Sequence, residues 1–267
     1  MRSKHILYPD NLPDDVARCA TYQADKSKAH CVCTRTTITP DRSLDFMQIS
    51  ILGGTGDFGE GIACRLAQNT HHMIKVGSRD TSKAEEAVAA YQEKIDGEST
   101  EQVVAGSNPE IVENADIIIV SVPPQYIETT IKSIRHQIPA DAIVVSPAVS
   151  MERDRAGFSY ARPDNGSVAE QVAAELPEGV PTVGAFHNLA AGSLADLRKE
   201  LDYNVIVTSD DSEAANTVCS LIEEVEGLQP IYGGGLANTG EIEAITPLLI
   251  NLAMENDDMH NVGVKFQ

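Results

Sequence analysis

The sequence predicts an α/β fold in which a doubly wound parallel sheet is followed by a smaller C-terminal α/β domain. From Met47 onward, short apolar runs alternate with segments whose apolar residues recur at helical spacing. Two runs, 117–122 and 142–145, are apolar at successive positions, as in strands buried on both faces. A glycine-rich turn joins the first run to the first helical segment. Such alternation gives parallel strands joined by right-handed crossovers.

Five strands and their connecting helices account for residues 49–145. In chain order we expect a strand at 49–52, a helix at 58–68, a strand at 73–76, a helix at 82–95, strands at 103–105 and 117–122, a helix at 124–134 and a strand at 142–145. The first helix repeats apolar residues three and four positions apart, whereas the second is charged and rich in alanine.

Beyond Pro147 the pattern is looser. A polar stretch at 151–165 is followed by a helix at 168–176, strands at 182–186 and 204–208, a helix at 212–225, a strand at 229–232 and a final helix at 241–253. We place a soft domain boundary near residue 180. It separates a first domain, 47–180, from a smaller C-terminal domain, 181–267.

Residues 1–46 differ from the rest of the chain. They lack a sustained apolar pattern and contain many turn formers and a threonine-rich run. We therefore expect a poorly ordered leader, and Met47, directly before the first strand, raises the alternative of a mis-called gene start. Cys19, Cys31 and Cys33 lack the spacing and the second ligand pair of a zinc site, so we predict no metal.

Acidic residues outnumber basic residues two to one. The chain has 40 Asp and Glu against 20 Lys and Arg, a formal net charge of −20. This balance disfavours nucleic-acid binding. It suits a surface built for concentrated salt, where charge repulsion is screened. We expect a halophilic protein, with an ordinary acidic cytosolic enzyme as the alternative.

Cysteine usage and hydropathy indicate the compartment. Five cysteines without paired spacing argue against a disulfide framework and for a reducing environment. No stretch approaches 18 uninterrupted apolar residues, and the N-terminus lacks the pattern of a signal peptide. We therefore expect a cytoplasmic protein without a membrane span.

The segment 49–59 carries the strongest chemical signal. Gly54, Gly56 and Gly59 form a G-x-G-x-x-G pattern that follows a strand and opens a helix. In Rossmann folds these glycines permit the tight turn, the approach of the backbone to a pyrophosphate, and close packing of helix on strand. The helix N-terminal amides then meet the anion. The pattern predicts a dinucleotide site, with a glycine turn that holds no ligand as the alternative.

The residues after the second strand favour NADP over NAD. NAD sites usually place a carboxylate there for the ribose 2′-hydroxyl. This chain has Ser78 and Arg79, with Lys83 one helical turn further on. A hydroxyl and an arginine fork suit a 2′-phosphate, which a carboxylate would repel. The alternative is that the two cations are merely solvated.

His187 is the most informative titratable residue. It directly follows the strand expected at 182–186. It could act as a general acid, orient a ligand, or simply pack in the protein interior, and the sequence leaves all three roles open. No catalytic residue is therefore certain. The loops containing Pro123, Pro124 and Pro147 end the fourth and fifth strands and should border the nicotinamide, because ligands bind beyond the carboxyl ends of parallel strands.

Several motifs together resemble the NADPH-dependent F420 reductases of archaea and actinobacteria. They are the glycine loop 53–59, the Ser78, Arg79 and Lys83 set, and the segments 144–147, 157–160, 187–191, 246–252 and 263–266. The resemblance extends from Met47 to the C-terminus. Combined with the acidity, it points to a haloarchaeal member. Residues 1–46 have no counterpart in the family.

The resemblance implies hydride transfer between NADP and the deazaflavin coenzyme F420, in a homodimer. The two rings stack face to face in that family, so side chains position them and none need take a proton. By motif, Thr55, Gly56, Asp57 and Phe58 would hold the pyrophosphate; Ser78, Arg79 and Lys83 the 2′-phosphate; Val122, Tyr126, Val149 and Ala191 the nicotinamide side; His187 and Leu189 the deazaflavin. Residues 47–180 would form the NADP-binding domain, and 181–267 would complete the deazaflavin site.

Two departures from the family pattern and two other functions remain in view. Pro124 stands where the family can carry Trp, and Thr239-Gly240 replaces a Ser-Arg element, which affects contacts with the deazaflavin tail. One alternative is another NADP-dependent reductase, of the pyrroline-carboxylate or imine reductase kind. The other is a non-catalytic NADP-binding subunit.

Overall fold

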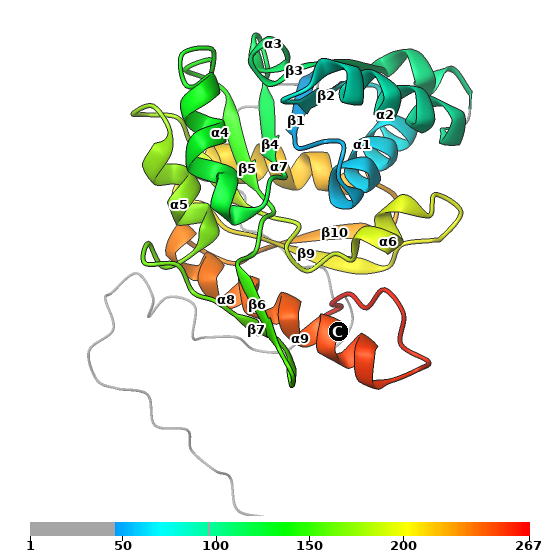
Figure 1. Cartoon of the computed structure of the whole chain (residues 1–267), viewed down its shortest axis with the longest axis vertical. Helices are drawn as coiled ribbons and strands as arrows, with labels where there is room; N and C mark the ends of the chain where they lie inside the picture. The colour runs from blue at the N-terminus through cyan, green and yellow to red at the C-terminus, as the bar shows by residue number, and fades with distance from the viewer. Residues whose placement is uncertain (1–45, 96) are drawn as a thin grey trace, which may run out of the picture. The chain divides into compact units, whose positions relative to one another are not determined.

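The computed structural model in Figure 1 describes residues 46–95 and 97–267. The expected leader therefore lies, apart from Phe46, outside the described residues. Within the described ranges, no helix combines the length and apolar character needed to cross a membrane.

Six parallel strands form the main sheet. They are β1 (Gln48–Leu52), β2 (Met73–Ser78), β3 (Val103–Ser107), β4 (Ile117–Val120), β5 (Ile143–Ser146) and β8 (Thr182–Gly184). Their order across the sheet is β3-β2-β1-β4-β5-β8, and every adjacent pair is parallel. The order reverses between β1 and β4, which confirms the predicted doubly wound sheet and places a crevice at that point.

Helices cover both faces of this sheet (Figure 1). One apolar core joins it to α1 (Asp57–Asn69), α2 (Thr81–Lys94) and α7 (Ser212–Glu223). The other joins it to α3 (Asn108–Val112), α4 (Ile127–Ile134) and α5 (Val168–Glu175). Ile117 and Ile119 point into the first core, whereas Ile118 and Val120 point into the second. A strand with two buried faces needs apolar residues at every position, which explains the uninterrupted run in β4.

The remaining elements lie outside the main sheet. They are the antiparallel hairpin of β6 (Met151–Asp154) and β7 (Gly157–Tyr160), the parallel pair of β9 (Tyr203–Val207) and β10 (Leu228–Tyr232), the helices α6 (Ala191–Ala195), α8 (Thr239–Glu243) and α9 (Ile245–Glu255), and the short 3₁₀ helices Gly97–Gln102, Pro124–Tyr126 and Leu236–Asn238. An antiparallel bridge between Gly184 and Thr208 links the β9–β10 pair to the main sheet.

Several expected boundaries were wrong. The strand expected at 182–186 ends at Gly184, because Phe186 has a φ of +69° and turns the chain. The hairpin at 151–160 was missed, and the expected final helix is two helices, α8 and α9, that meet at Ala244. The domain boundary near 180 stays a prediction; β8, directly after it, extends the main sheet at β5.

Arg65 fixes α1 to the segment that contains α6. Its buried guanidinium donates hydrogen bonds to the carbonyl oxygens of Ser193, Leu194, Asp196 and Lys199 at 2.5–3.1 Å. Because this segment has only one short helix, several of its carbonyl groups have no helical hydrogen-bond partner. The guanidinium of Arg65 supplies the donors for them.

Replacing Arg65 should destabilise the protein. Arg65→Met keeps much of the apolar stem but leaves carbonyl groups without their donor, so we expect the free energy of unfolding to fall by on the order of 3 kcal/mol. Denaturant unfolding measures the loss, with Arg198→Met as the control because Arg198 is exposed. Equal stabilities of the two variants would contradict a structural role for Arg65.

Candidate functional site

The turn between β1 and α1 is shaped by its glycines. Gly53 has a φ of +72°, and a Cβ on it would stand 2.4 Å from the carbonyl oxygen of Ser121. A Cβ on Gly59 would stand 2.6 Å from the Cα of Gly54. At Gly56 the nearest atom to a Cβ would be 3.6 Å away, which leaves that side of the loop open. These contacts fit a dinucleotide pyrophosphate, which needs a tight turn and an open backbone at the start of a helix.

The cations after β2 lie at the rim of the sheet. Arg79 is exposed, and its guanidinium carbon lies 5.2 Å from the centre of the Tyr126 ring. Lys83 is exposed in the first turn of α2. Within the described part of the chain, no carboxylate lies within 4 Å of either cationic group. Both charges are therefore available to an anionic ligand such as a 2′-phosphate.

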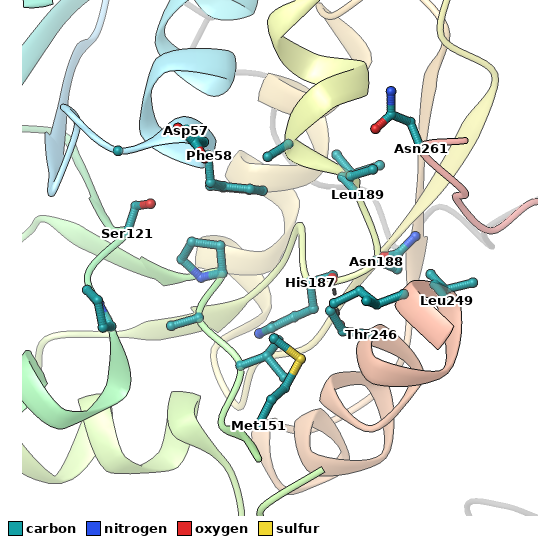
Figure 2. Close-up of a pocket in the computed structure, with 18 of the residues that line it drawn as sticks. Asp57, Phe58, Ser121, Met151, His187, Asn188, Leu189, Thr246, Leu249 and Asn261 are labelled. Carbon is teal, nitrogen blue, oxygen red and sulfur yellow. Dashed lines mark hydrogen bonds between the residues drawn. The ribbon is translucent and has the colours of Figure 1, made fainter. Parts of the chain in front are cut away.

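A pocket of about 610 Å³ opens beyond the carboxyl ends of β1, β4, β5 and β8 (Figure 2). Its volume is ordinary for a small-molecule site. Eight residues expected at the site line it: Gly56, Asp57, Phe58, Val122, Val149, His187, Leu189 and Ala191. Seven others do not: Gly54, Thr55, Gly59, Ser78, Arg79, Lys83 and Tyr126. Tyr126 instead lies against Arg79.

Other lining residues were not predicted as site residues. They are Ser121, Ala148, Met151, Asn188, Ala190, Thr246, Leu249, Ile250, Ala253, Met254, Asn261 and Val262, together with the expected loop prolines 123, 124 and 147. For the pocket wall formed by α9, the sequence did give a signal, because the motif at 246–252 was one of the segments that carried the family resemblance. Met151, Asn261 and Val262 carry no local pattern, because their place in the pocket depends on the fold alone.

His187 lines the pocket, and Figure 2 shows it near Met151 and Thr246. Its side chain is fully buried, and neither ring nitrogen has a hydrogen-bond partner among the described residues. The Thr246 hydroxyl donates a 2.7 Å hydrogen bond to the backbone carbonyl of His187. Burial lowers the pKa of His187 to about 3. At neutral pH the ring is therefore neutral, with one donor and one acceptor that no described residue satisfies.

Glu243 lies behind His187. Its Oε1 is 4.0 Å from His187 Nε2, and both side chains are fully buried. The carboxylate accepts hydrogen bonds from the Tyr160 hydroxyl at 2.9 Å and from the amides of Val168 and Ala169 at 2.8 and 3.2 Å. Burial raises the pKa of Glu243 despite these donors. This carboxylate joins the β6–β7 hairpin to the first turn of α5, and the amide contacts there favour its charge.

The pocket is suited to positioning flat groups. Its walls are mostly apolar, from Phe58, the loop prolines, Met151, Leu189 and Leu249, and its titratable lining residues are Asp57 and His187. No group of three or more metal-ligating side chains occurs among the described residues. The lining has no nucleophile paired with a base, so the arrangement fits a reaction that depends on orientation.

Comparisons with known proteins agree with this geometry. Residues 48–150 match the family described as NADP oxidoreductase, coenzyme F420-dependent. The chain is 36% identical over 222 residues to an F420-dependent NADP reductase of Methanothermobacter thermautotrophicus, which covers 82% of this chain and 94% of that protein. It is 37% identical over 212 residues to the F420-dependent NADP reductase of Methanocaldococcus jannaschii, covering 77% and 92%.

A solved structure shares the fold. A putative F420-dependent NADP-reductase from Arthrobacter sp. FB24 aligns with a TM-score of 0.66 and 19% identity, over 83% of this chain and 99% of that one. At this identity the likeness supports the arrangement of strands and helices and carries no residue roles.

The lowered pKa of His187 should appear in the pH dependence of stability. Its pKa is below the ordinary 6.5 in the folded protein, so the unfolded chain binds the proton more readily. Stability from this residue is complete above pH 6.5 and is lost as the pH falls toward 3. Between these limits the wild type should lose about 1.4 kcal/mol per pH unit more than His187→Gln.

Denaturant unfolding from pH 7.5 to 4.5 tests this difference, with the exposed His136→Gln as the matched control. Glu243 is present in all three proteins, so its opposite contribution largely cancels in the comparison. If the free energies of unfolding of the wild type and His187→Gln changed equally with pH, the prediction of a neutral buried histidine would be refuted.

Proposed function

The chain belongs to the family of F420-dependent NADP reductases, and we propose that its apolar pocket orients the nicotinamide of NADPH against the deazaflavin ring of coenzyme F420. The enzyme is an oxidoreductase that transfers a hydride between NADP(H) and F420. In the direction of F420 reduction, NADPH gives up one hydride, the deazaflavin gains that hydride and one proton, and NADP⁺ is the product. The similarity over most of the chain is the observation that carries this conclusion.

We assign the NADP contacts to the rim that contains the glycine turn and the cations. The open side of Gly56 supports a pyrophosphate beside Thr55, Asp57 and Phe58. The free charges of Arg79 and Lys83 support a 2′-phosphate there, with Ser78. The contact between Tyr126 and Arg79 supports a place for Tyr126 at this phosphate and away from the nicotinamide.

We assign the ring contacts to the pocket itself. Val122, Val149 and Ala191 would border the nicotinamide, and His187 and Leu189 the deazaflavin. With its pKa near 3, His187 is not an imidazolium at neutral pH and does not supply the reaction's proton in that form. Its role in this proposal is to border the deazaflavin as a neutral, buried group that keeps the pocket wall in place.

The alternatives predict other features. Pyrroline-carboxylate and imine reductases follow the nucleotide domain with an all-helical dimerisation domain, whereas this chain has the β9–β10 pair after its main sheet. A non-catalytic NADP-binding subunit would keep the same binding residues but would show no turnover. An assay of turnover therefore separates that alternative from the enzyme.

We further propose a cytoplasmic, halophilic and homodimeric enzyme of archaeal origin. The net charge of −20 supports adaptation to salt, and the two methanogen relatives support the archaeal origin. The helix α9 supports the dimer, because Pro247 is its one buried residue whereas Leu248 and Leu252 are 56% and 38% exposed. Apolar side chains gathered on one exposed helix are typical of a protein interface.

Purified protein should oxidise NADPH only when F420 is added, with one deazaflavin reduced per NADPH. The reaction should be faster in molar KCl than at 0.1 M KCl.

Arg79→Met should weaken NADPH binding roughly tenfold or more, because charge-assisted hydrogen bonds to the 2′-phosphate are lost. Its use of NADH should change little.

Absorbance at the separate maxima of the two coenzymes follows this reaction, and Arg198→Met serves as the control. No turnover with F420 would overturn the function. An equal loss with NADPH and NADH would overturn the role of Arg79.

The dimer is tested by placing a charge on α9. Leu248 is exposed and does not line the pocket, so Leu248→Glu should shift the protein from dimer to monomer while its fold persists. Sedimentation in molar KCl measures the mass, and Ile231→Glu on β10 is the control because Ile231 is also exposed. A monomeric wild type would refute the proposal.

A further inference from the structure

A second cavity continues the first along the β6–β7 hairpin. It has a volume of about 440 Å³ and is lined by Pro124, Gln125, Val149, Ser150, Met151, Phe158, Pro163 and Gln171. Pro124, Val149 and Met151 also line the first pocket, so the two spaces share a wall. The second cavity has neutral polar groups and no acidic side chain in its lining.

The hairpin divides its charges between two faces. Arg153 pairs with Phe158 across the strands, and Met151 pairs with Tyr160. Since paired residues of an antiparallel ladder project to the same side, these four side chains share one face. Met151 and Phe158 place that face toward the second cavity. Glu152 and Asp154 alternate with them and belong to the opposite face.

Arg153 does not line this cavity itself but contacts Phe158, which does, and it has no acidic partner among the described residues. Its guanidinium carbon lies 5.2 Å from the centre of the Phe158 ring, a cation–π contact. The side chain is exposed, and across the described ranges no carboxylate lies within 4 Å of it. In a chain with twice as many acids as bases, such a cation is a distinctive feature beside a cavity.

Arg162, the nearby cation after β7, is already neutralised. It forms an ion pair with Glu241 at 2.6 Å and donates a hydrogen bond to the carbonyl oxygen of Gly166. Its guanidinium also fills the space beside Gly240, where a Cβ would stand 2.8 Å from Nη1. Gly240 is a position at which this chain departs from the family pattern, and the cation beside it, Arg162, is already engaged by Glu241.

We propose that the second cavity and Arg153 bind the anionic tail of coenzyme F420. The tail has a phosphodiester followed by glutamate carboxylates, which matches a free guanidinium and a cavity with amide and hydroxyl groups but no acids. The two spaces are adjacent, because three residues line both, and in this proposal the ring occupies the first pocket while the tail extends along the hairpin. This inference rests on the proposed function, because it assigns a subsite to the same coenzyme.

The test compares F420 with its tail-less analogue, the 8-hydroxy-5-deazariboflavin that has the ring and ribityl chain alone. Binding is measured by the fluorescence of each deazaflavin, without NADPH. Arg153→Met should raise the Kd of F420 roughly three- to tenfold at 0.1 M KCl and leave the Kd of the analogue unchanged. The difference should shrink at 1 M KCl, where exposed charges are screened.

Two further variants sharpen the result. Arg153→Lys should recover most of the F420 affinity, because it retains the charge. Arg155→Met is the matched control, since Arg155 lies in the turn of the same hairpin and is also exposed. Its Kd for F420 should equal that of the wild type.

The outcomes distinguish failure of the tail subsite from failure of the proposed function. An unchanged Kd of F420 in Arg153→Met, or an equal rise for both deazaflavins, overturns the tail subsite. If the wild type still reduces the analogue with NADPH in that case, the proposed function stands without it. If the wild type binds neither deazaflavin, the proposed function fails, and the tail subsite fails with it.

Discussion

Close packing of α1 sets the position of the pocket. Gly59 lets this helix approach the turn after β1, where a Cβ would stand 2.6 Å from the Cα of Gly54. Gly61 does the same toward α6, with 2.6 Å from its Cβ position to the Cβ of Leu194. Arg65 then holds the segment after α6 by its carbonyl groups. One helix therefore fixes both the wall at Phe58 and the wall formed by the residues just before α6.

The main sheet was accessible from the sequence because its physical cause is local. A strand with two buried faces must be apolar throughout, and Ile117–Val120 shows that pattern without ambiguity. The hairpin was missed for the opposite reason, since every residue of β6 is exposed and its sequence lacks apolar alternation. The early end of β8 depends on the positive φ of Phe186, and no residue preference indicates such a conformation for phenylalanine.

The candidate site was predictable in part. The glycine turn and His187 were identified because their residue types imply particular chemistry. Part of the α9 wall, including Leu249, lay in the motif at 246–252, whereas Met254 is an ordinary apolar residue whose place in the pocket depends on long-range contacts. The electrostatic state of His187 was also hidden, because its lowered pKa arises from burial among residues distant in the chain. Residue identity thus indicated some of the residues that line the pocket, whereas the fold determined the charge of His187.

A buried neutral imidazole has a consequence for reversibility. It carries one N–H and one lone pair, and its two tautomers exchange these functions without a change in net charge. Reduction of a deazaflavin turns a ring nitrogen from an acceptor into a donor. Under the proposed placement of that ring, His187 stays neutral beside either redox form, so the charge of the pocket does not change. Neither redox form is then favoured by a buried ion, so the histidine places no electrostatic bias on the direction of hydride transfer.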